Sequence, residues 1–161
     1  METIQRDEFL KDILVILRET FEGSPDGQPS AYLDRGIGIF PTIEKLTADE
    51  ASSDVHGTTI AGQIEHAKFY LDRTVEFIKG RTETVNWDQS WLIEDVNEVE
   101  WDALRSAVRK SYDDVLKCFA EVEIWDQDNI GVAVAIIAHT AYHLGAIRQI
   151  AKSKSSTDEN R

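Results

Sequence analysis

The stretch IGVAVAIIAHTAYHLGAIRQI, residues 130–150, is the most apolar part of this 161-residue chain, and two histidines stand in its centre. At 100° per residue, a single helical face collects six of its side chains: Val132, Ile136, His139, His143, Ile147 and Ile150. A stripe of this kind predicts a helix that faces the interior of a helical bundle. We therefore expect both imidazoles to point inward.

His139 and His143 are four residues apart, so one helical face can direct both rings at a single ion. Neutral imidazole is a good ligand for zinc, copper, iron or nickel. The alternative is that both are ordinary core histidines, each bonded to a carbonyl or hydroxyl group and kept neutral by burial. A third ligand is needed to decide between these interpretations.

The rest of the chain predicts an all-α protein. Helical periodicity indicates four long helices over about residues 5–22, 58–79, 98–121 and 129–152, with no competing strand alternation. Thr58 or Thr59 is suited to cap the second helix, and Asp126 or Asp128 the fourth. We predict a four-helix bundle that forms one domain over residues 1–152. The polar tail, residues 153–161, is expected to be disordered.

Two connections are longer than the loops of an idealised bundle. Residues 23–57 contain three prolines and a short helical pattern near 42–46, and we expect this segment to be a crossover that leaves the first two helices parallel. The predicted topology is therefore up-up-down-down. Residues 81–97 carry Trp87 and Trp91, which either border a site or cap one end of the core.

Charge and composition exclude several classes of protein. A net charge of −13, from 30 acidic and 17 basic residues, is unsuited to binding a nucleic-acid backbone. The basic runs 105–110 and 148–154 resemble solvated helix faces or a helix C-terminal turn. Cys118 is the only cysteine, so no intramolecular disulfide can form, and its position on a helical pattern predicts a small buried residue. No signal-peptide pattern or long apolar span is present, so we expect a cytoplasmic protein with no membrane partner.

A third histidine, His66, lies on the second predicted helix beside its apolar stripe, and taken alone it would be an exposed residue. Its segment TTIAGQIEH, residues 58–66, together with HTAYHLGAIRQ, residues 139–149, resembles the DinB/YfiT-like superfamily. The resemblance extends over nearly the whole chain. It implies an up-up-down-down four-helix bundle in which three histidines bind a divalent metal, here His66, His139 and His143. Zinc or nickel is the expected ion, with iron or manganese as alternatives.

The same resemblance implies a class of chemistry and a partner. Members of the superfamily include transferases that use low-molecular-weight thiols such as bacillithiol or mycothiol, so we expect a homodimeric, metal-dependent thiol S-transferase. A metal-dependent hydrolase, a non-catalytic metal-binding or stress-associated dimeric module, and a bundle without metal remain alternatives. Three imidazoles would leave an open coordination position, as catalytic sites do.

The sequence does not identify an acid or base for this chemistry. Thr140 stands where a zincin carries its glutamate, so the peptidase motif is incomplete. Glu65 is expected to be a solvated helix charge, and His56, which has no counterpart in the resembled pattern, a loop or capping residue. Tyr70 and Tyr142 are candidate pocket hydroxyls, since each lies within about one helical turn of a histidine.

Overall fold

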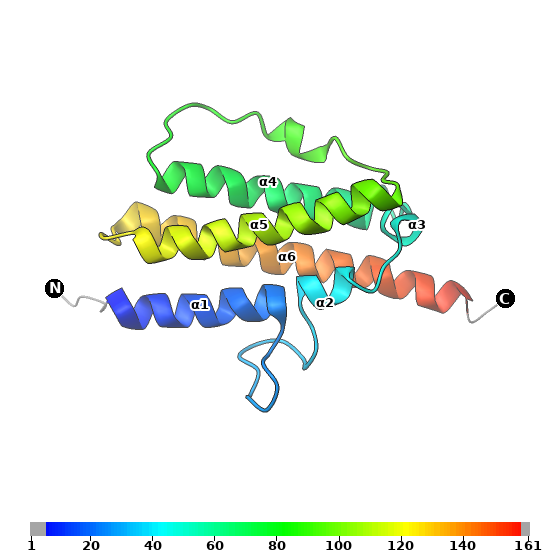
Figure 1. The fold of residues 1–161 in the computed structure, drawn as a ribbon, viewed down its shortest axis with the longest axis horizontal. Coiled ribbons are helices and arrows are strands. Elements are labelled where there is room, and N and C mark those ends of the chain that lie inside the picture. The colour runs from blue at the N-terminus through cyan, green and yellow to red at the C-terminus, as the bar shows by residue number, and fades with distance from the viewer. Residues whose placement is uncertain (1–5, 159–161) are drawn as a thin grey trace.

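The computed structural model describes residues 6–158, and within that range the chain is helical, without strands. Four long helices lie along one another, with two short helices and one 3-10 turn between them (Figure 1). The four long helices predicted from the sequence are confirmed, and the short helical pattern begins earlier than expected. In chain order the elements are α1 (Arg6–Glu22), α2 (Ile39–Ile43), α3 (Ala48–Ala51), α4 (Ile60–Ile78), η1 (Trp87–Trp91), α5 (Glu98–Glu121) and α6 (Gln127–Asp158).

Local capping fixes where the long helices begin. The Thr59 hydroxyl accepts the Gly62 N–H at 3.0 Å, so Thr59 is the cap of α4. Asn97 and Glu100 form a reciprocal capping box at the start of α5. The Asp126 carboxylate accepts the Asn129 N–H at 2.9 Å at the start of α6. The sequence offered two candidate caps for α4 and two for α6, and these hydrogen bonds identify Thr59 and Asp126.

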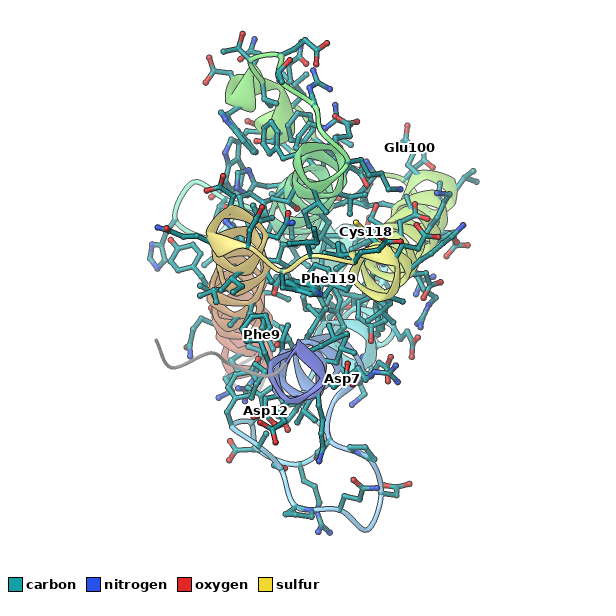
Figure 2. The ribbon with its side chains drawn as sticks, turned by 90° about the vertical axis from the view of Figure 1, so that its left-hand side faces the viewer. Asp7, Phe9, Asp12, Glu100, Cys118 and Phe119 are labelled. Carbon is teal, nitrogen blue, oxygen red and sulfur yellow. The ribbon has the colours of Figure 1, made fainter. Side chains whose placement is uncertain are left out.

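The core lies between the four long helices and extends under α2 and α3. Figure 2, which looks along the helices, shows α1, α4, α5 and α6 arranged around the core to which Phe119 belongs. Trp101 is fully buried and donates its indole N–H to the carbonyl of Leu46 at 2.9 Å, which ties α5 to the end of the first connection. The largest fully buried side chains are Trp101, Phe21, Phe119, Leu17, Ile39, Ile43, Ile60, Ile64, Leu71, Ile136, Leu144 and Ile147.

The direction of the helices differs from the prediction. Phe21, near the end of α1, stacks on Tyr112 of α5, whereas Phe9, near the start of α1, packs on Trp125 just beyond the end of α5, so α1 and α5 are antiparallel. Asp72 accepts a hydrogen bond from Ser111, and α4 runs parallel to α5 (Figure 1). The prediction that the first two long helices are parallel, and with it the up-up-down-down order, is therefore wrong.

The reason for the difference lies in what the two connections pack against. Phe40 of α2 packs on Phe21 and Leu46 is tied to Trp101, so residues 23–59 carry the chain past the end of α1 instead of returning it to the start of α1. As a result, α4 starts beyond the end of α1 and runs back antiparallel to it (Figure 1). The second connection, which follows α4, instead passes along the outer side of α4 to reach the start of α5 (Figures 1 and 2). It is this segment that leaves two helices parallel.

A buried carboxylate holds the loop after α1. Glu19, only 4% exposed, accepts backbone N–H groups from Ala31, Tyr32 and Leu33 at 2.5, 3.1 and 2.7 Å. Burial by itself would raise the pKa of Glu19, but these three hydrogen bonds lower it below the usual carboxyl value. The ionised form of Glu19 therefore stabilises the loop.

The inner face of α6 is rotated slightly from the predicted stripe. Its fully buried positions include Ala133, Ile136, Thr140 and Ile147, and the Thr140 hydroxyl donates to the carbonyl of Ile136 at 2.8 Å. His143 is 2% exposed and lies within this face, whereas His139 is half-buried and lies at its edge. The expectation that both point into the centre is correct for His143 and only partly so for His139.

Helix α6, with 32 residues, is the longest helix. It continues to Asp158, through residues expected to belong to the disordered tail, because no glycine or proline follows Gly145 to end it; residues 159–161 lie outside the described range. By length and composition alone, residues 127–153 could also cross a membrane, and 33% of the most apolar window is buried in the fold. The core helix of a globular protein passes the same test, so this finding is weak evidence for a span.

Candidate metal centre

Two helices place three histidines side by side. His66 lies in the middle of α4, and His139 and His143 lie one turn apart on the antiparallel α6. One potential ligand atom from each ring lies within 4.8 Å of the others, and the ring centroids are 5.0, 4.8 and 4.4 Å apart. The cluster contains no carboxylate or thiol among the described residues. All three histidines singled out in the sequence are thus brought together.

These separations suit a shared divalent ion. Two nitrogens bound at about 2.0–2.1 Å can be no more than about 4.2 Å apart across an ion, so the widest pair must approach a little on binding. The half-buried rings of His66 and His139 can make such a movement by small side-chain rotations. The donor set fits zinc, nickel, copper or iron.

A hydrogen bond fixes the tautomer of His143. Its Nδ1 lies 2.6 Å from Oε1 of Gln63, and the Gln63 amide nitrogen donates to the Thr58 hydroxyl at 2.8 Å. The Gln63 oxygen can only accept, so His143 must carry its proton on Nδ1. Its Nε2 is then left with the free electron pair that a metal needs.

The same reasoning applies to His66. Its Nδ1 lies 2.7 Å from the hydroxyl of Ser90, which is fully buried and donates its only proton to the carbonyl of Trp87 at 2.6 Å. Ser90 must therefore accept from Nδ1–H, and Nε2 of His66 is free. A hydrogen bond at the second ring nitrogen is the usual support of a metal-binding histidine.

His139 provides the most direct sign that the cluster suits a cation. Its Nε2 is buried and has no hydrogen-bond partner. Buried polar atoms are nearly always paired, and an unpaired one costs about 1–3 kcal/mol. A cation held between the three Nε2 atoms would satisfy this nitrogen.

The electrostatics favour neutral rings. Burial, with a smaller contribution from the neighbouring histidines, lowers the pKa of His143 to about 3 and that of His139 to about 4. Burial also lowers the pKa of His66. All three are therefore unprotonated at neutral pH, which is the form that binds metals.

Aromatic rings enclose the histidines. Trp91 stacks on His66 with a centroid distance of 3.9 Å and an angle of 18°, and Tyr70 stacks on His139 at 3.7 Å and 14°. Tyr142 meets His143 edge-on at 5.1 Å and is 72% exposed. Trp91 is 44% exposed, so it separates the cluster from solvent on one side. The sequence left open whether the tryptophans border a site, and Trp91 does so.

Three residues outside the ligand set, Cys118, His56 and Glu65, also had predicted roles. Cys118 is buried and burial raises the pKa of its thiol, as expected of a small core residue. His56 lies in an exposed loop with φ of 57°, outside the cluster. Glu65 differs from its prediction as a solvated charge: its side chain is 16% exposed, pairs with Lys68 at 3.7 Å, and has a pKa raised by burial.

The sequence analysis missed Gln63 and Ser90. Gln63 lies one turn before His66 on α4, and its polarity inside an apolar helical face was a usable signal. Ser90 carried no comparable signal, because it reaches His66 only through the path of the second connection. Gly62 permits that path: a Cβ atom there would lie 2.9 Å from the carbonyl oxygen of Ile93.

Comparison with models of known protein families, with curated proteins and with solved structures found no match for this chain.

Proposed function

We propose that the four long helices form the four-helix bundle of a metal-dependent enzyme whose ion is held by His66, His139 and His143. The observation that carries this proposal is the buried, unpaired Nε2 of His139 beside two rings whose Nδ1 atoms are already engaged. A structural zinc site would be closed by a fourth protein ligand, and the cluster offers none among the described residues.

We further propose that the reaction is the transfer of a low-molecular-weight thiol. A divalent ion on three neutral imidazoles would supply Lewis-acid chemistry that lowers the pKa of a thiol or of water. A thiol, with a pKa of about 8.5, loses its proton far more readily than water, with a pKa of about 15.7. Since no carboxylate of the described part of the chain belongs to the cluster, a nucleophile that needs no protein base is the better match, and the resemblance to thiol-dependent transferases supports the same choice.

The chain's own residues have separate parts in this proposal. Gln63 and Ser90 orient the rings of His143 and His66. Trp91 and Tyr70 exclude water from the flat faces of His66 and His139. Thr140 does not take part, because it is fully buried and its hydroxyl is committed to the backbone of α6.

Metal analysis tests the first part of the proposal. After dialysis against zinc or nickel, the wild-type chain should retain about one ion per chain, and His139→Ala should retain none. His56→Ala is the matched control, since it removes an exposed histidine outside the cluster. Equal metal content in wild type and His139→Ala would overturn the proposed centre.

A transfer assay tests the second part. With 1-chloro-2,4-dinitrobenzene as acceptor, the thiol sulfur forms a bond to the ring carbon, chloride leaves, and the thiol proton passes to solvent. Bacillithiol, mycothiol and cysteine are the donors to compare. Turnover that depends on the thiol and disappears in His139→Ala would support the transferase. Full metal occupancy without thiol-dependent turnover would reject the transferase while leaving the metal centre intact.

We also propose that the chain acts as a homodimer through the outer face of α6. Support comes from an uncharged face, exposed except at the half-buried Ala135 and Ala141, that is nearly symmetric about Ala138, with residues three, four and seven positions away on either side. An antiparallel second copy would pair Val134 with Tyr142, which are 50% and 72% exposed, and would bring the two open glycines together. The face consists of Gly131, Val134, Ala135, Ala138, Ala141, Tyr142 and Gly145.

A further inference from the structure

A pocket lies on α6 away from the histidine cluster. It has a volume of about 290 Å³ and is lined by residues of α2, of the segments on either side of α2, and of the C-terminal half of α6. Arg148 lies five residues after His143, which places it about 140° around the helix and about 7.5 Å further along. The pocket is therefore distinct from the proposed metal centre.

The charge of this pocket is opposite to that of the molecule. Three cationic side chains line it, Lys45, Arg148 and Lys152, whereas the chain as a whole has a net charge of −13. The one acidic residue in the lining is Glu50, whose carboxylate accepts the Thr47 N–H at 2.8 Å in a capping box. Net positive charge is thus concentrated at one place on an acidic protein.

Among the residues that the structure describes, two of the three cations pair with no carboxylate. Most cations on the long helices pair with an acidic neighbour, as Lys68 does with Asp72 and Lys110 with Asp114. Within the described residues, Lys45 and Arg148 form no such pair. Arg148 and Lys152 are also four residues apart on one helix, an arrangement of like charges that costs a few tenths of a kcal/mol. These like charges are therefore unfavourable in the fold alone and would be stabilised by a bound anion.

The rest of the lining is apolar. Ile37, Pro41, Leu46 and Ala151 supply hydrocarbon surface beside the cations. A volume of 290 Å³ corresponds to about ten molecules of liquid water and lies at the lower end of the range for small-molecule sites. A bare inorganic anion would leave most of that surface uncovered.

We propose that this pocket binds a small soluble organic anion, with a phosphate or carboxylate head held by Arg148 and Lys45 and a short apolar body against Ile37 and Leu46. An arginine can bind such a head through two parallel hydrogen bonds. A membrane surface is the less suitable source of the same chemistry, because the pocket is concave and a charge of −13 opposes approach to anionic lipid. The site needs no metal and is independent of the function proposed above.

Calorimetric titration of the metal-loaded chain with hexyl phosphate tests the proposal. We expect saturable binding of one molecule per chain, and affinity about tenfold weaker for inorganic phosphate, which lacks the apolar body, and for hexanol, which lacks the charge. Hexanoate in place of hexyl phosphate compares the two head groups. Binding should persist in His139→Ala, so that failure of the metal centre does not affect this result.

Charge-removing variants locate the site. Arg148→Gln should weaken hexyl phosphate binding by about tenfold, and Lys45→Gln should weaken it as well. Lys117→Gln is the matched control, since it removes one exposed positive charge on α5, outside the pocket. Circular dichroism checks that each variant is folded. If Arg148→Gln does not fold, Lys45→Gln still tests the site.

Four results would overturn the proposal. They are the absence of binding at millimolar hexyl phosphate, equal losses in Arg148→Gln and Lys117→Gln, equal affinity for hexanol, and binding to phosphatidylglycerol vesicles that Arg148→Gln abolishes. The last of these would assign the pocket to a lipid surface.

Discussion

Gln63 and His143 meet across two helices at 2.6 Å, although 80 residues separate them in the chain. This hydrogen bond joins α4 to α6 inside the core and determines which nitrogen of His143 is free. Because Gln63 is in turn held by Thr58 at 2.8 Å, the orientation of its amide is set by the start of α4. The geometry of the proposed centre thus depends on a residue that is not itself a ligand.

Replacing Gln63 with leucine should weaken metal binding without removing a ligand. The leucine side chain has a similar volume but cannot accept the hydrogen bond from Nδ1–H of His143, so we expect zinc affinity to fall by about 10–100-fold. Competition with a chromogenic chelator measures this. Gln63→Glu, which retains an acceptor, should bind zinc more tightly than Gln63→Leu; equal affinities would show that the hydrogen bond has no effect on the centre.

Trp91 should report metal binding by its fluorescence. Its ring stacks on His66, so any change in the charge or position of that imidazole changes the environment of the indole. We expect zinc to change the emission of the wild type, with most of that change lost in Trp91→Phe. Trp101→Phe is the control, because that indole is buried against Leu46 in another part of the core. A response that survives in Trp91→Phe would contradict the stacked arrangement.

The metal-free protein should lose stability on mild acidification. His139 and His143 have folded pKa values of about 4 and 3, below the usual 6.5, so the unfolded chain binds protons first as the pH falls. Stability is therefore retained above pH 6.5 and is lost between 6.5 and about 3, by up to about 1.4 kcal/mol per pH unit for each proton. Urea unfolding at several pH values measures the slope. His143→Gln should flatten it, and an unchanged slope would contradict the assignment.

Glu19→Gln should destabilise the loop that follows α1. A neutral amide has one oxygen in place of two and cannot serve all three backbone donors, so we expect a loss of about 2 kcal/mol in the free energy of unfolding. The pKa of Glu19 is lowered in the fold, so its contribution is present above pH 4.5 and disappears as the pH falls below that value. Wild type and variant should therefore converge in strong acid; a constant difference would point to packing instead.

Ala138→Glu tests the proposed homodimer. A carboxylate at the centre of the outer face of α6 would meet its own copy across the two-fold axis, so we expect a dimeric wild type and a monomeric variant in analytical ultracentrifugation. Lys117→Glu is the control, because Lys117 is exposed on α5 and its substitution changes charge outside that face of α6. A monomeric wild type at high micromolar concentration would contradict the proposal.

Much of this architecture can be predicted from hydrophobic periodicity and from capping residues in the sequence. The apolar spacing predicted the four long helices because each buries one face, and the i,i+4 spacing of the two histidines predicted that both rings lie on the same side of α6. The helix directions were not accessible in the same way. They depend on Phe40 packing on Phe21, a tertiary contact that keeps the first connection at one end. Ser90 was missed for a related reason, since a small polar residue in a connection reveals its partner only when the path is known.

The second connection, residues 79–97, contributes little to the core but contacts His66. Of residues 79–97, only Val96 contributes an apolar side chain to the buried core, yet Ser90 and Trp91 both serve His66. Proteolytic nicking in the exposed stretch 82–84 would therefore spare the scaffold while releasing the restraint on one imidazole. Stability comes from the packed helices, whereas the second connection restrains a proposed ligand. Substitutions in this connection should therefore change the properties of the proposed centre with little effect on folding.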